Sequence, residues 1–151
     1  MIKRIAYLSI HTCPLARPGS GDAGGMNVYV DGLARTMAKR GVQVEVFTRQ
    51  NDQGGQGVVE VEDGYRVVHI DLGPDNGDLL QMVSGFTAGV MTWAAENGAS
   101  YDVVLMSYLK ENLIIQLLNL EIILKMVIGF LLKHQKEKNL HQKIYFTGLM
   151  F

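Results

Sequence analysis

Apolar residues gather into short runs whose lengths are typical of strands. The run at 3–10 has few polar breaks, as expected of a strand that is buried on both faces of a sheet. Residues 42–49 form a second run of this kind, and 101–106 form a shorter one. Between them, 58–72 is rich in valine around the turn sequence EDGY, which predicts a hairpin.

Two further segments are predicted to be helices. Apolar side chains recur at helical spacing from Val30 to Met37, and Gly41 follows a basic last turn as a stop signal. Residues 79–95 are predicted to form a second helix. The alternation of strands and helices over residues 1–104 predicts an α/β domain with a Rossmann-like, mostly parallel sheet.

The remaining residues, 105–151, differ in composition and contain no Ala, Pro, Asp or Arg. Good helix formers dominate them, so we expect a mainly helical tail from about residue 107. Residues 113–132 are long and apolar enough to consider a membrane span. A lysine near the centre of a span costs roughly 2.5–3.5 kcal/mol, which disfavours a span interrupted by polar residues. Those residues are Gln116, Asn119, Glu121 and Lys125.

Composition and charge narrow the classes of partner. The formal net charge of −1 gives no electrostatic reason to expect nucleic acid or an anionic membrane. Cys13 is the single cysteine, so neither an intramolecular disulfide nor a cysteine metal cluster can form. A reduced, cytoplasmic setting fits, and the N-terminus is predicted to be a buried strand rather than a secretory signal.

A glycine-rich segment, GSGDAGGMNVYV at 19–30, separates the first strand from the first helix. Free N–H groups and the helix dipole make such a helix start favourable for an anion. Gly24 and Gly25 would let a ligand approach the backbone closely, and Asn27 offers an amide in the first turn. The alternative is that these glycines make only a flexible turn.

The same segment also contains the dinucleotide pattern G-x-G-x-x-G, at Gly19, Gly21 and Gly24. In that fingerprint the first glycine follows the strand directly, whereas 11–18 intervene here. Arg49 ends the second strand where an acidic residue is usual, and it would suit a 2′-phosphate. An NADP-binding oxidoreductase domain therefore stays an alternative, as does a non-catalytic membrane-associated protein anchored by the tail.

The stretch LSIHTCPLARPGSGDAGGMNVYVDGLARTMAKRGVQVEVFTR resembles the opening of family 4 glycosyltransferases, most closely those that act on inositol phosphate. The segments YRVVHIDLGP, FTAGV and YDVV extend the resemblance, which covers about residues 2–104. The resemblance implies the GT-B architecture, in which two Rossmann-like domains face a cleft. It further implies retaining transfer from a UDP-sugar, such as UDP-N-acetylglucosamine, to a hydroxyl acceptor bound mainly by the N-terminal domain.

The resemblance also suggests roles for individual residues, with no catalytic side chain, metal ligand or cofactor expected in this half. Donor-binding residues would be Arg17, Pro18 and Gly25, and acceptor-binding residues would be His11, Asp22, Ala23, Gly24, Gly25, Met26 and Asn27. Each has a structural alternative: His11 as a core histidine, Arg17 as a solvated charge, Asp22 as a turn or helix cap, and Met26 as packing.

Three departures from the family pattern are visible. No lysine occurs between Lys39 and Lys110, where close relatives carry one for the acceptor phosphate. LMSYLKEN stands where the family has HSHYWLSG. The second domain is also absent from this sequence, so the chain alone is expected to be inactive. The amino-acid composition of 105–151, rich in Leu, Ile, Lys, Asn and Phe, suggests a tail that does not belong to the family and was translated in a shifted reading frame. Sequencing of the locus would test this hypothesis.

Overall fold

The computed structural model describes residues 1–19, 24–50, 55–74, 77–106 and 143–144. Over residues 1–106, strands and helices follow one another as the sequence predicts. The elements are β1 Arg4–Leu8, α1 Gly25–Ala38, β2 Gln43–Arg49, β3 Val58–Glu62, β4 Tyr65–Ile70, α2 Leu79–Glu96, β5 Val103–Met106 and β6 Lys143–Ile144.

These strands form one twisted sheet in the order β3-β4-β2-β1-β5-β6. Every pairing is parallel except that of β3 with β4, which is the predicted hairpin. Gly64 lies in its turn with φ +79°, a conformation that side-chain-bearing residues rarely adopt. The Rossmann-like α/β fold expected for the N-terminal half of a GT-B enzyme is therefore confirmed for this chain.

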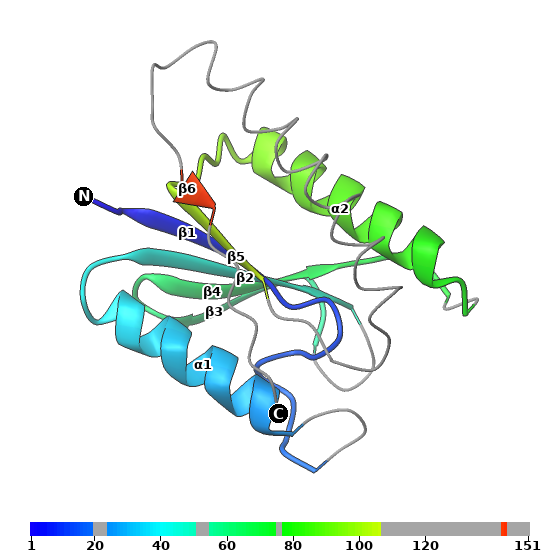
Figure 1. The fold of residues 1–151 in the computed structure, drawn as a ribbon, viewed down its shortest axis with the longest axis horizontal. Coiled ribbons are helices and arrows are strands. Elements are labelled where there is room, and N and C mark those ends of the chain that lie inside the picture. Colours follow the sequence, from blue (N-terminus) through cyan, green and yellow to red (C-terminus); the bar gives the residue numbers. More distant parts are fainter. Residues whose placement is uncertain (20–23, 51–54, 75–76, 107–142, 145–151) are drawn as a thin grey trace.

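The two helices cover opposite faces of the sheet (Figure 1). The alternation along β1 explains the two cores, because Ile5 and Tyr7 pack with α1 whereas Ala6 and Leu8 lie on the α2 side. Strands buried on both faces need apolar residues at successive positions, which accounts for the unbroken runs in the sequence.

β6 differs from the sequence expectation. Lys143–Ile144 pairs in parallel with β5, so these two residues extend the sheet rather than a helix. A two-residue strand has too short a pattern to be recognised from sequence. For 107–142 and 145–151 the expected helical structure lies outside the described residues, and the division of the chain at residue 104 stays a prediction.

Candidate functional site

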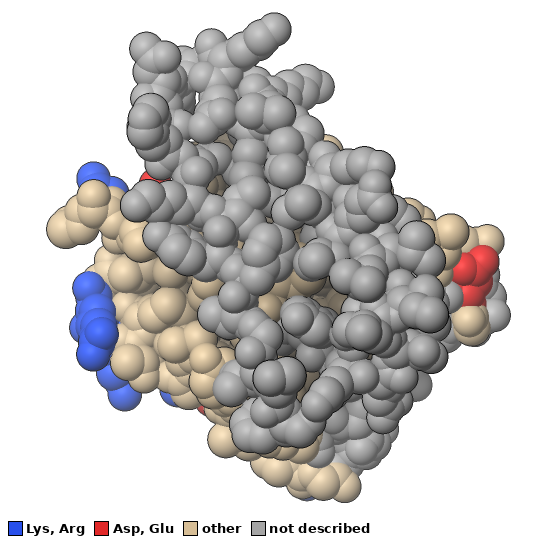
Figure 2. Space-filling view, in the orientation of Figure 1, with Lys and Arg blue, Asp and Glu red and all other residues tan. Residues whose placement is uncertain are grey.

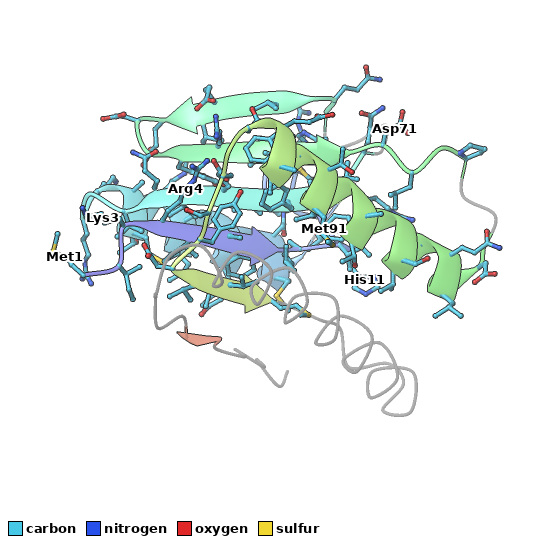
Figure 3. The ribbon with its side chains drawn as sticks, turned by 90° about the horizontal axis from the view of Figure 1, so that it is seen from above. Met1, Lys3, Arg4, His11, Asp71 and Met91 are labelled. Carbon is cyan, nitrogen blue, oxygen red and sulfur yellow. The ribbon has the colours of Figure 1, made fainter. Side chains whose placement is uncertain are left out.

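The carboxyl ends of β1, β2, β4 and β5 meet at one edge of the sheet, and the segments that follow them gather there. Figure 3 shows His11 and Asp71 at this edge, with Met1, Lys3 and Arg4 at the opposite, amino edge. Open parallel sheets bind ligands outside the carboxyl ends of their strands. The candidate residues of the sequence analysis that fall in the described part lie on this side.

Several exposed basic side chains lie away from the carboxyl edge of the sheet. Lys39 and Arg40 are exposed in the turn between α1 and β2, on the amino side of the sheet together with Lys3. Figure 2 shows described basic atoms along that side of the molecule and acidic atoms at the opposite end. Anion binding at the carboxyl edge would therefore depend on local groups rather than on a general positive field.

Buried polar contacts shape the loop that follows β1. The N–H of Ser9 donates to the carbonyl of Phe47 at 2.8 Å, and its hydroxyl donates to the carbonyl of Thr12 at 2.8 Å. The N–H of Ala16 then closes a turn on the carbonyl of Cys13 at 3.1 Å. Ser9, Thr12 and Cys13 are each at most 5% exposed, so the loop is packed against the domain.

Three residues of this loop that the sequence analysis assigned to ligands are partly or fully exposed. His11 is half-buried, which does not agree with a fully buried core histidine, and Arg17 and Pro18 are exposed. These side chains can therefore be approached from solvent at the carboxyl edge. Asp22 and Ala23 lie outside the described residues, so their expected acceptor contacts stay predictions.

Helix α1 begins at Gly25, as the sequence predicts, and its N-cap residue Gly24 has no side chain to satisfy the first N–H groups. The first turn of α1 also carries no acidic residue. Helix α2 differs, because the Asp78 carboxylate accepts from the N–H groups of Leu80 and Gln81 at 3.0 and 3.1 Å. Among the described residues, the start of α1 thus keeps donors and a positive dipole end that no cap side chain neutralises.

The described packing does not explain the glycine pair at this helix start. A Cβ placed at Gly24 or Gly25 would meet no atom of the described chain within 4 Å, and neither residue has a positive φ. A larger residue would therefore fit both the backbone and the described neighbours. No described atom fills the space beside these two glycines, which agrees with close approach by a ligand.

Asn27 and Met26 point inward to different degrees. Asn27 is 1% exposed, and its Nδ2 donates to the carbonyl of Ala16 at 2.7 Å, so this amide ties α1 to the preceding loop. Its Oδ1 is buried and has no hydrogen-bond partner among the described residues. Met26 is half-buried and packs against the α1 core. Their expected acceptor contacts stay predictions.

One contact at this edge was missed by sequence reasoning. The sulfur of Cys13 lies 3.5 Å from Nε2 of His69, a residue of β4. Sequence analysis treats Cys13 as a buried filler and His69 as a structural strand residue, and both are indeed buried. Burial raises the pKa of the Cys13 thiol, and the backbone N–H groups of Leu15 and Ala16 partly oppose that rise. The pair is 56 positions apart, so no local spacing could reveal it.

The described residues give no support to the two alternatives. Residues 9–24 separate β1 from α1, unlike the direct step of the dinucleotide fingerprint, and Nη1 of Arg49 lies 3.4 Å from the sulfur of Met82. No described helix is long and apolar enough to cross a membrane, and 113–132 lies outside the described residues. No three described His, Cys, Asp or Glu side chains are grouped to hold a metal ion.

Comparison with known proteins adds independent findings. Residues 24–129 match the family model for a glycosyl transferase 4-like domain, which begins at the glycine pair and extends beyond residue 104. The chain is 49% identical over 106 residues to the D-inositol 3-phosphate glycosyltransferase of Xylanimonas cellulosilytica and 50% identical over 108 residues to that of Kineococcus radiotolerans. These alignments cover 67% and 68% of this chain. The chain spans about a quarter of the length of these relatives, 25% in each case.

A solved structure agrees on the fold. Sucrose-phosphate synthase from Thermosynechococcus elongatus superposes with a TM-score of 0.66 at 22% sequence identity. The match covers 97% of this chain and 33% of that one.

Proposed function

The chain belongs to the family of glycosyl transferase 4-like domains, and from that premise we propose that it is the acceptor-side part of a retaining glycosyltransferase. The full enzyme would transfer a sugar from a UDP-linked donor, with N-acetylglucosamine as the first candidate, to a hydroxyl of an inositol phosphate. The relatives named D-inositol 3-phosphate glycosyltransferase are about half identical to the chain where they align, which supports the acceptor class of this proposal.

The observation that carries the proposal is the open start of α1 at the carboxyl edge of the sheet. Gly24 provides no cap, and the space beside Gly25 is free of described atoms. In the proposed reaction the diphosphate of the donor gains negative charge as the sugar leaves. Fixed N–H groups and the helix dipole in front of it would stabilise that charge without reorganising.

The surrounding residues fit roles in binding rather than in covalent catalysis. His11, half-buried at the carboxyl edge of the sheet, would contact the acceptor or the transferred sugar, and exposed Arg17 and Pro18 would lie near the donor. The donor's own phosphate would guide the incoming hydroxyl. This half of the enzyme would then contribute orientation and charge stabilisation.

A chimeric enzyme tests this proposal. Residues 1–106 would replace the corresponding segment of the Kineococcus radiotolerans relative, and transfer from UDP-N-acetylglucosamine to inositol 3-phosphate would be assayed. We expect the chimera to be active. Gly25→Val should lower its kcat/KM by about five- to thirtyfold, because a branched side chain would block a contact worth roughly 1–2 kcal/mol.

Gly32→Val is the matched control for that substitution. Gly32 is also an exposed glycine of α1 with no described atom within 4 Å of a Cβ, but it lies about two turns away from the helix start. The control should keep the activity of the chimera. Equal activities for Gly25→Val and the unsubstituted chimera would contradict the proposal.

A further inference from the structure

Three segments that are distant in sequence are joined by buried polar contacts behind the candidate site. Nδ1 of His69 lies 2.9 Å from the carbonyl oxygen of Gly57, at the start of the β3–β4 hairpin. Nε2 of the same ring lies 3.5 Å from the sulfur of Cys13, in the loop after β1. Asn27 continues the chain of contacts by holding the carbonyl of Ala16 at 2.7 Å.

The chemistry of these groups fixes the direction of each hydrogen bond. A carbonyl oxygen can only accept, so Nδ1 of His69 must carry the proton that faces Gly57. In the tautomer with its proton on Nδ1, the ring presents the lone pair of Nε2 to Cys13. The thiol is 2% exposed and its pKa is raised by burial, so it keeps its proton and can donate to that lone pair.

We propose that His69 is a positioning residue, which holds the loop after β1 in place through the thiol of Cys13. We call the Cys13–His69 contact the latch. The same loop carries His11, Arg17 and Pro18, so the latch would determine the positions of these side chains. The consequence for ligand binding rests on the proposed function, whereas the latch itself does not.

Two small replacements of Cys13 distinguish a hydrogen-bonding role for its thiol from a role in apolar packing alone. Cys13→Ala removes the donor, and Cys13→Ser keeps a hydroxyl donor at the same position, on a shorter bond to Cβ. If Cys13 were only an apolar filler, serine would be tolerated no better than alanine, because it buries a hydroxyl in its place. If the thiol donates to His69, serine should restore what alanine loses.

Hydrogen–deuterium exchange of the 151-residue chain, without any nucleotide, measures the difference. Losing one buried hydrogen bond should speed exchange of the loop amides at residues 12–17 by about three- to tenfold in Cys13→Ala. Cys13→Ser should stay within about twofold of the wild type. His69→Asn, which can keep the bond to Gly57 but not reach Cys13, should resemble Cys13→Ala, and the double variant should add little to either change.

Tyr101→Phe is the control for general destabilisation. It removes the buried hydroxyl that contacts Glu45 at the amino edge, far from the loop in the fold. Its loop amides should exchange at the wild-type rate. The latch is overturned if Cys13→Ser exchanges as fast as Cys13→Ala, or if Tyr101→Phe accelerates the loop equally. Because no nucleotide is present, this result is separate from that of the chimera assay.

Discussion

Glu45 is a carboxylate within the core that lies between the sheet and α2. It is 3% exposed, and it bonds the guanidinium groups of Arg4 and Arg66 and the hydroxyl of Tyr101. Arg66 also stacks over Trp93, 4.9 Å from the ring centroid. Burial and the bond to Glu45 raise the pKa of Tyr101, so its hydroxyl stays protonated and donates. The cluster lies at the amino edge, and we assign it a structural role.

Replacing Glu45 by glutamine should destabilise the domain. Two guanidinium groups would lose their shared carboxylate, while their side chains, 27% and 30% exposed, keep partial access to water. We expect the free energy of unfolding to fall by about 1–3 kcal/mol in urea titrations. Glu60→Gln is the control, because Glu60 is 69% exposed and 3.6 Å from Arg66, and it should change stability by less than about 0.5 kcal/mol. Similar losses for both variants would contradict the assignment.

Among the elements, the contact of α2 with β4 depends on a glycine. A Cβ at Gly89 would overlap Cγ2 of Ile70, which is 7% exposed and cannot move away freely. Helix and strand therefore approach more closely at this point than a side chain would allow.

Gly89→Ala should lower the free energy of unfolding by about 1–3 kcal/mol through overpacking. Gly32→Ala should instead raise it by about 0.5–1 kcal/mol, because Gly32 is a mid-helix glycine with open space around it. Thermal and urea unfolding of the two variants would measure these opposite signs. A stabilised Gly89→Ala variant would show that α2 can shift outward at no cost.

The start of β5 is joined to β1 by a carboxylate. Asp102 accepts from the backbone N–H of Lys3 at 2.7 Å and from that of Arg4 at 3.0 Å. These bonds hold the pKa of Asp102 below its ordinary value, and the bond from Lys3 has the larger effect. A lowered pKa in the folded state contributes stability above the unfolded-state pKa, and this contribution is lost as the pH falls through the folded-state pKa.

Comparison of the wild type with Asp102→Ala tests this dependence. The difference in unfolding free energy should be constant above about pH 5 and should shrink as the pH falls below about 4. Urea titrations at a series of pH values would follow it. A difference that grows on acidification would have the wrong sign for a lowered pKa.

In the whole molecule, the features predicted from sequence are those that a local pattern can encode. The predicted ranges 42–49 and 79–95 correspond closely to β2 and α2, because burial of strands and helices fixes the spacing of apolar residues. The glycine pair was likewise placed at a helix start. The contacts of Glu45 and the latch were not predicted, since their partners come from different strands and loops. Burial of such groups depends on the pairing of the whole sheet.

The central claim is that the open start of α1 binds the diphosphate of a nucleotide-sugar. A helix terminus contributes roughly 0.3–1 kcal/mol when exposed and up to ~2 kcal/mol when partly buried. Several such contacts barely exceed the roughly 4 kcal/mol of a millimolar complex. From contacts of this strength, we expect the 151-residue chain to bind UDP only at millimolar concentration.

Titration of the 151-residue chain with UDP, followed through its backbone amide resonances, tests this claim most directly. The account predicts that the amides of residues 24–27 shift in the millimolar range, that Gly25→Val abolishes these shifts, and that Gly32→Val retains them. Amides that shift only elsewhere in the chain, or equal shifts in the wild type and Gly25→Val, would contradict it.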